Sequence, residues 1–119
     1  MELRVSAQPD DGWFVSWQMR ASCRDYHYKE AERLWFPEPK PGLTKASNTA
    51  IRVCFSCPVQ AECLAFAVTR REEYGIWGGA LPTLRAERNR ALGDVADAER
   101  VRDIAEAAES YARGKGIIP

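Results

Sequence analysis

Four cysteines with the spacing C-x30-C-x2-C-x5-C are the residues best suited to chemistry in this chain. Cys54, Cys57 and Cys63 lie within ten positions, and Cys23 lies upstream. Thiolates bind zinc and iron–sulfur clusters, and a C-x2-C pair also suits disulfide exchange. The first residues do not resemble a secretory signal, so we expect a reducing, cytoplasmic location. In such a compartment, grouped thiols more often hold metal or carry out redox work than form static disulfides.

Three interpretations of the cysteines remain open from their spacing alone: a zinc site, an iron–sulfur cluster, or thiols without metal that are merely buried or disulfide-linked. Three ligands from one segment, closed by a distant fourth, are typical of a cluster, but a C-x2-C pair serves zinc equally well. Aromatic residues that could shield a cluster occur nearby in the sequence, at Tyr26, Tyr28, Trp35, Phe36, Phe55 and Phe66. His27 is a potential fifth donor, although a surface histidine is the plainer interpretation.

Composition excludes several other classes of protein. Lys plus Arg and Asp plus Glu both number 17, so bulk charge does not draw the chain to nucleic acid. The only basic island that we single out is Arg85, Arg88 and Arg90, a candidate for weak phosphate contact. No Ser/His/Asp arrangement, phosphate loop or βαβ pattern accompanies the cysteines. We therefore expect no enzyme and no small-molecule substrate, and no apolar run is long enough to span a membrane.

The pattern of apolar residues predicts an all-α fold of short helices with one additional amphipathic helix at the C-terminus. We expect helices over residues 10–21, 28–35, 44–54, 58–70, 82–93 and 94–113. Pro58, directly after Cys57, suits the first residue of a helix. The expected organisation is a cysteine-bearing domain over residues 1–93, followed by an acidic amphipathic helix and a short tail over 94–119.

The stretch YGIWGG places three glycines around Trp77. Glycine tolerates positive φ, so the stretch predicts a tight turn that carries a large rigid ring. The ring either fills the protein's own core or is offered to a partner, since tryptophan is frequent both in interiors and among interface anchors.

Taken in order, these features resemble the WhiB-like (Wbl) family of actinobacterial and actinophage transcription regulators, over about residues 13–92. The resemblance rests on C-x2-C-P-V-x3-C followed by a helix and G-I-W-G-G. It is strengthened by Trp17 six residues before Cys23 and by the run Trp35–Phe36–Pro37. The aromatic pair reads Trp–Phe where Phe–Phe is usual in the family.

The resemblance implies a [4Fe-4S] cluster, held by Cys23, Cys54, Cys57 and Cys63. It also implies binding to the C-terminal domain (region 4) of the primary sigma factor of RNA polymerase. The partner-binding residues carried over are Trp17, Trp35, Phe36, Pro37, Gly75, Ile76, Trp77, Gly78 and Gly79. Because the helix after the basic island is acidic, we expect weak or indirect promoter contact and hypothesise competition with host regulators of the same family. The alternative is a zinc-binding protein-interaction or DNA-binding module.

Overall fold

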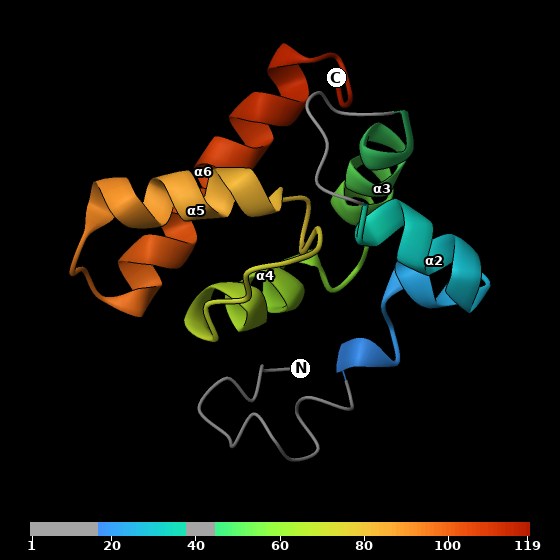
Figure 1. Cartoon of the computed structure of the whole chain (residues 1–119), viewed down its shortest axis with the longest axis horizontal. Coiled ribbons are helices and arrows are strands. Elements are labelled where there is room, and N and C mark those ends of the chain that lie inside the picture. The colour runs from blue at the N-terminus through green and yellow to red at the C-terminus, as the bar shows by residue number, and fades with distance from the viewer. Residues whose placement is uncertain (1–16, 38–44) are drawn as a thin grey trace.

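The computed structural model of the chain describes residues 17–37 and 45–119, and every named element in these ranges is a helix (Figure 1). The predicted all-α class is therefore confirmed. The expected helix over 10–21 lies mostly outside the described residues. The elements in chain order are η1 (Ser22–Asp25), α2 (Tyr28–Trp35), α3 (Lys45–Phe55), α4 (Gln60–Thr69), α5 (Pro82–Leu92) and α6 (Asp97–Gly114).

Local capping explains the two helices whose predicted bounds agree best with the structure. The ring nitrogen Nδ1 of His27 accepts the N–H of Lys29 at 3.2 Å and so caps the start of α2. Helix α5 begins with Pro82, which needs no N–H partner there, and is followed by Gly93 at φ +66°. A glycine in this position ends a helix without the strain that a side chain would bring.

Two predicted helix starts are wrong by two or three residues. Helix α4 begins at Gln60 rather than at Pro58, because the Gln60 N–H donates to the Cys57 carbonyl at 3.2 Å and closes a turn. Cys57 is thus held in a turn before the helix. Helix α6 begins at Asp97 because its N-cap, Ala96, is still extended.

The buried side chains form three hydrophobic groups, which we call the first, second and third cores. The first core joins α2, α3, the glycine-rich turn and the C-terminus through Leu34, Trp35, Ala50, Ile51, Cys54, Ile76, Leu81, Ala112 and Ile117. The second core joins α4 and α6 through Leu64, Val68, Ala80, Ile104 and Ala108. The third core is Trp17, Val59 and Phe66. Residues far apart in the sequence therefore share each interior.

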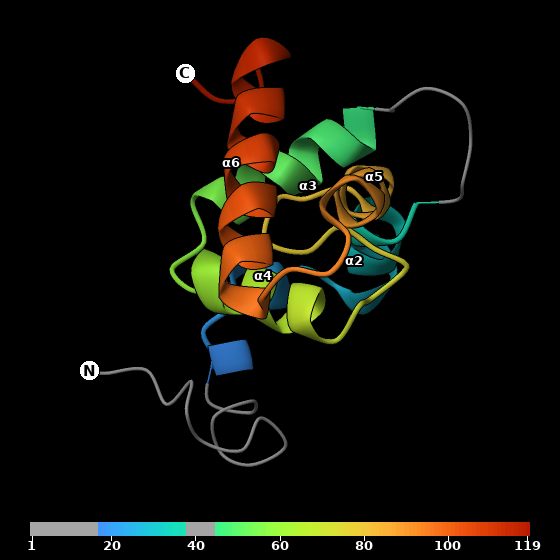
Figure 2. The same ribbon diagram turned by 90° about the vertical axis from the view of Figure 1, so that its left-hand side faces the viewer.

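Helix α6 is integrated with the rest of the molecule rather than appended to it. It packs against α4 and α5, and the chain after it returns to α3 (Figure 2). There the Arg52 guanidinium donates to the Ile117 carbonyl at 3.2 Å. On the opposite side, Arg88 of α5 pairs with Asp103 of α6 at 2.8 Å. The apolar stripe of α6 thus completes two cores while its charged face pairs with neighbours.

Within residues 17–37 and 45–119, no single helix combines the length and apolar character of a membrane span. Helices α3 and α4 have the length and composition of a membrane span only when they are taken together, and they meet at a bend of 113°.

Replacing Ile104 by alanine tests the contribution of α6 to the core. Ile104 is fully buried in the second core, so the change should lower the free energy of unfolding by about 2–5 kcal/mol. The same replacement at Ile118, which is only partly buried, is the matched control and should cost clearly less. The measurement is urea unfolding followed by far-ultraviolet circular dichroism on protein purified without oxygen. Equal costs at the two positions would contradict this placement of α6.

Candidate metal centre

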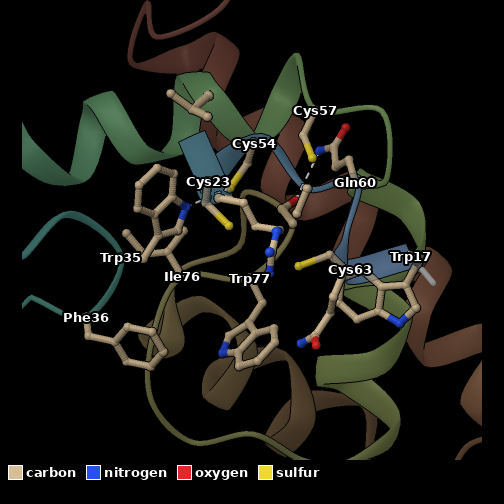
Figure 3. Close-up of a pocket in the computed structure, with 15 residues that line it drawn as sticks. Trp17, Cys23, Trp35, Phe36, Cys54, Cys57, Gln60, Cys63, Ile76 and Trp77 are labelled. Carbon is tan, nitrogen blue, oxygen red and sulfur yellow. Dashed lines mark hydrogen bonds between the residues drawn. The ribbon is translucent and has the colours of Figure 1, made fainter. Parts of the chain in front are cut away.

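All four cysteines line one cavity of about 260 Å³ (Figure 3). Cys23 comes from η1, Cys54 from the last turn of α3, Cys57 from the connection between α3 and α4, and Cys63 from α4. All four are free thiols. The rest of the lining is largely aromatic and aliphatic, and includes Trp17, Trp35, Phe36, Val53, Ile76 and Trp77. The fold thus converts a dispersed sequence pattern into one sulfur-lined chamber.

The cavity lies at the boundary between two of the hydrophobic cores. Cys54 belongs to the first core, and Cys23 packs against it. Cys57 and Cys63 pack against the third core. A group bound by all four sulfurs would therefore join two cores that come from different parts of the chain.

Hydrogen-bond donors point at the sulfurs. The indole N–H of Trp35 donates to Cys54 Sγ at 3.3 Å, and the backbone N–H of Ser22 donates to Cys57 Sγ at 3.4 Å. Backbone N–H groups of the glycine-rich turn also act on two of the sulfurs, Gly79 on Cys54 and Gly78 on Cys63. Such donors stabilise negative charge on sulfur, as metal-bound thiolates require.

Burial has the opposite effect, because it favours the neutral form of three of the free thiols and so raises their pKa. It raises the pKa of Cys54 to about 11, with the Trp35 and Gly79 hydrogen bonds opposing the rise. Burial also raises the pKa of Cys63 and, together with the charge of Cys57, that of Cys23. Burial thus favours the neutral and less nucleophilic thiol at Cys23, Cys54 and Cys63. A cationic centre would supply the missing counter-charge and hold the sulfurs as thiolates.

The spacing of the donor side chains bears on the kind of metal centre that the site could hold. Among the described residues, no three Cys, His, Asp or Glu side chains lie near enough to hold one metal ion. Zinc would need sulfurs about 2.3 Å from a common centre. His27 is exposed, and its ring nitrogen is used to cap α2, so it is not placed to act as a fifth ligand. Four thiols around a larger chamber fit a cluster that takes one thiolate per iron.

The glycine-rich segment forms the tight turn that the sequence predicted. Trp77 and Ala80 exchange backbone hydrogen bonds at 3.2 and 2.9 Å around Gly78 at φ +57° and Gly79 at φ +86°. Positive φ at both central residues is the type I′ arrangement. A Cβ on Gly78 would also lie 2.7 Å from the Leu64 Cβ, so the turn can rest directly on α4 only without a side chain there. The Gln60 side chain donates to the Gly78 carbonyl at 3.0 Å and fixes the same contact.

Arg85 corrects one expectation from the sequence, since it does not face solvent with the basic island. It is 2% exposed, and its guanidinium donates to backbone carbonyls on either side of the turn, those of Glu72, Tyr74, Gly75 and Ala80. Burial lowers the pKa of Arg85 to about 10, so the side chain remains cationic at neutral pH. The four carbonyl oxygens accept hydrogen bonds in place of the water that the guanidinium loses on burial. Arg85 thus holds the turn and is not available for DNA phosphates.

The two other arginines of the island lie on the outside of α5. Arg88 forms a two-bond ion pair with the carboxylate of Asp103, at 2.8 and 3.0 Å. This pair ties α5 to α6 and leaves Arg88 partly neutralised. Arg90 is exposed. The island therefore presents less positive charge to solvent than the sequence indicates.

The predicted partner-binding residues divide into interior and surface groups. Trp17, Trp35 and Ile76 are buried, as are the three glycines of the turn. Phe36 is 49% exposed, and Trp77 is half-buried between Phe36 and Phe66, with ring centroids at 6.5 and 5.7 Å. Figure 3 shows Phe36 and Trp77 beside each other, on one side of the cysteines. The surface thus offers only part of the predicted aromatic set.

Two residues near the site were missed from the sequence. Tyr74 is 74% exposed, and its carbonyl accepts the Trp77 indole N–H at 2.8 Å. Gln60 lines the cavity and holds the turn. Tyr74 adjoins Gly75, so an aromatic residue directly before the glycines was a signal available in the sequence. The role of Gln60 depends on a contact across 18 positions that no local pattern indicates.

Comparison with known proteins places this geometry in a family. The sequence profile described as transcription factor WhiB matches residues 17–92. The transcriptional regulator WhiD of Streptomyces coelicolor is 38% identical over 102 residues, which are 80% of this chain and 87% of that protein.

Two further relatives match over a shorter range. The redox-responsive transcriptional regulator WhiB3 of Mycolicibacterium smegmatis is 38% identical over 65 residues, or 53% of this chain and 65% of its own. The transcriptional regulator WhiB1 of Mycobacterium tuberculosis is 36% identical over 67 residues, or 55% and 74%. The profile covers more than half of the chain, including all four cysteines and the glycine-rich turn. This chain therefore belongs to the WhiB family of transcription regulators.

Proposed function

We propose that the protein is an iron–sulfur transcription regulator that binds region 4 of the primary sigma factor of RNA polymerase. The observation that carries the proposal is the single cavity lined by four free cysteines, with Phe36 and Trp77 on its outer wall. Family membership and the names of its relatives support a role in transcription, acting by binding rather than by catalysis. The same role supports a cytoplasmic location, in a bacterium or in the host of a phage.

Cys23, Cys54, Cys57 and Cys63 would hold a [4Fe-4S] cluster, which supplies a one-electron redox couple. The chain's own residues prepare the site for it. Trp35, Ser22 and the turn glycines direct N–H groups at the sulfurs, and the rest of the lining is mostly apolar. The printed name of one relative, redox-responsive, supports a role for that couple.

The partner surface proposed for the sigma factor is the aromatic edge formed by Phe36, Tyr74 and Trp77. Two of these side chains are largely exposed, and the third is half-buried against them. The Phe36 ring lies against the Gly75 backbone, where a Cβ would meet it at 2.5 Å. Rigid aromatic side chains that lose little entropy on docking are typical interface anchors. Because the edge rests on the cavity wall, cluster binding and partner binding depend on the same turn.

Iron content tests the proposed cofactor. Protein purified without oxygen should be brown and contain about four iron and four sulfide per chain, one iron for each thiolate. Cys57→Ser should lose most of both, since it removes one ligand. Ser56→Ala changes the exposed neighbouring residue and should keep them. A colourless wild-type protein containing zinc would overturn the proposal in favour of the alternative module.

Sigma binding is tested by co-expression with region 4 under the same conditions. Trp77→Ala and Phe36→Ala should each weaken the complex about tenfold or more, because they remove anchors from the aromatic edge. Tyr28→Ala is the control, since Tyr28 is 70% exposed on α2 and stacks on His27 instead. Affinity is measured by isothermal titration with purified components. Equal loss in all three variants, or in none, would refute this surface.

Promoter contact without sigma factor should be weak. Arg85 is buried, Arg88 is paired, and α6 carries acidic residues nearby, so few cations are left for phosphate. We expect duplex DNA to bind at about micromolar affinity or weaker at physiological salt, in the range of non-specific contacts. Fluorescence anisotropy with labelled promoter DNA measures this. Nanomolar binding in the absence of sigma factor would contradict it. A weak DNA contact also supports regulation by occupation of the sigma surface, in competition with host regulators of the same family.

A further inference from the structure

Trp35 is a tryptophan whose polar atom faces inward. Its side chain is 5% exposed, and its indole N–H donates to Cys54 Sγ at 3.3 Å (Figure 3). The sequence assigned this residue to the partner surface. The burial and direction of its ring indicate a different task, toward the sulfur ligand.

Two contacts hold Trp35 in place. The Tyr26 ring packs against it edge-on, with centroids 5.3 Å apart and planes at 72°. The Trp35 carbonyl accepts the Ile76 N–H at 2.7 Å, which holds the backbone against the turn. Trp35 belongs to the apolar first core. A hydrogen bond in surroundings of low polarity is electrostatically stronger than the same bond in water.

We propose that Trp35 raises the reduction potential of the cluster through its N–H bond to the Cys54 sulfur. The inference rests on the proposed function, since it requires the cluster. An N–H donor stabilises negative charge on a sulfur ligand, and that charge is larger after the centre accepts an electron. The bond is therefore stronger in the reduced state, and reduction is favoured relative to a site without the donor. Cys54 is the sulfur affected first, and Trp35 acts through it as a positioning residue.

The other donors to sulfur are backbone N–H groups, those of Ser22, Gly78 and Gly79. Trp35 differs from them because its N–H can be removed by substitution. Phenylalanine at this position would keep an aromatic ring in the first core but donate nothing. Trp77 provides a comparison in the same cavity wall, because its indole N–H donates to the Tyr74 carbonyl and not to sulfur. Loss of ring size can thus be separated from loss of the N–H donor.

The experiment is an anaerobic redox titration of Trp35→Phe, Trp77→Phe and the wild-type protein. Dithionite supplies the single electron, which converts the oxidised cluster to its one-electron-reduced form without making or breaking a bond. The ratio of reduced to oxidised cluster is read from the visible absorbance and from electron paramagnetic resonance. At a fixed applied potential, Trp35→Phe should lower this ratio by about threefold or more, a fraction of what one charge-assisted hydrogen bond contributes. Trp77→Phe should leave the ratio within error of the wild type.

The outcomes separate this inference from the proposed function. An unchanged ratio in Trp35→Phe with the cluster intact overturns the inference alone. Equal shifts in Trp35→Phe and Trp77→Phe also overturn it, because ring size would then be the cause. A wild-type protein without iron overturns the proposed function itself. If Trp35→Phe fails to retain its cluster, benzothienylalanine at position 35 replaces it, since sulfur there removes the N–H and keeps the shape of the ring. That protein must show the lower ratio, or the inference fails.

Discussion

The arrangement of the site depends on the gathering of four sulfurs at the boundary between two hydrophobic cores. Cys23 and Cys54 belong to the side of α2 and α3, and Cys57 and Cys63 to the side of α4. A small chain has limited apolar surface to bury, so a centre bound by all four sulfurs would stabilise it by joining the two cores. Burial raises the pKa of Cys54 and of Cys63, so a positive charge at this boundary would be needed to hold their sulfurs as thiolates.

The glycine-rich turn connects this centre to the surface. Its backbone contacts sulfurs on one side, and on the other it carries Trp77 and adjoins Phe36. Arg85 holds the turn from beneath with bonds to four carbonyls, which is why a cation is buried here without a carboxylate partner. A shift in the position of the sulfur ligands would therefore be transmitted by the turn to the aromatic edge. Under the proposed function, this coupling would be a physical reason for one segment to serve both the cofactor and the partner.

The C-terminal helix gives the chain a reinforcement outside the region that matches the family profile. Residues 17–92 match, yet α6 and the tail supply Ile104, Ala108, Ala112 and Ile117 to the first and second cores. Its acidic outer residues also neutralise part of the basic face of α5, through Asp103 on Arg88. One element thus strengthens the interior and reduces the charge available to DNA.

The sequence by itself determined the helical class, the identity of the four cysteines and the tight turn at Gly78 and Gly79. These features are local: helical periodicity, the C-x2-C pair and the need for positive φ are all expressed within a few residues. The helix start after Pro58 was misjudged because a competing turn bond between Gln60 and Cys57 decided it. Only the tertiary structure decided which way the side chains face. The sequence indicated that Arg85 is a surface cation and that Trp35 is a partner anchor. In the structure, Arg85 donates to carbonyls and Trp35 to a sulfur, and these acceptors are distant in the sequence. Burial is set by packing between segments that are remote in sequence, so no local pattern could have assigned either residue to the interior.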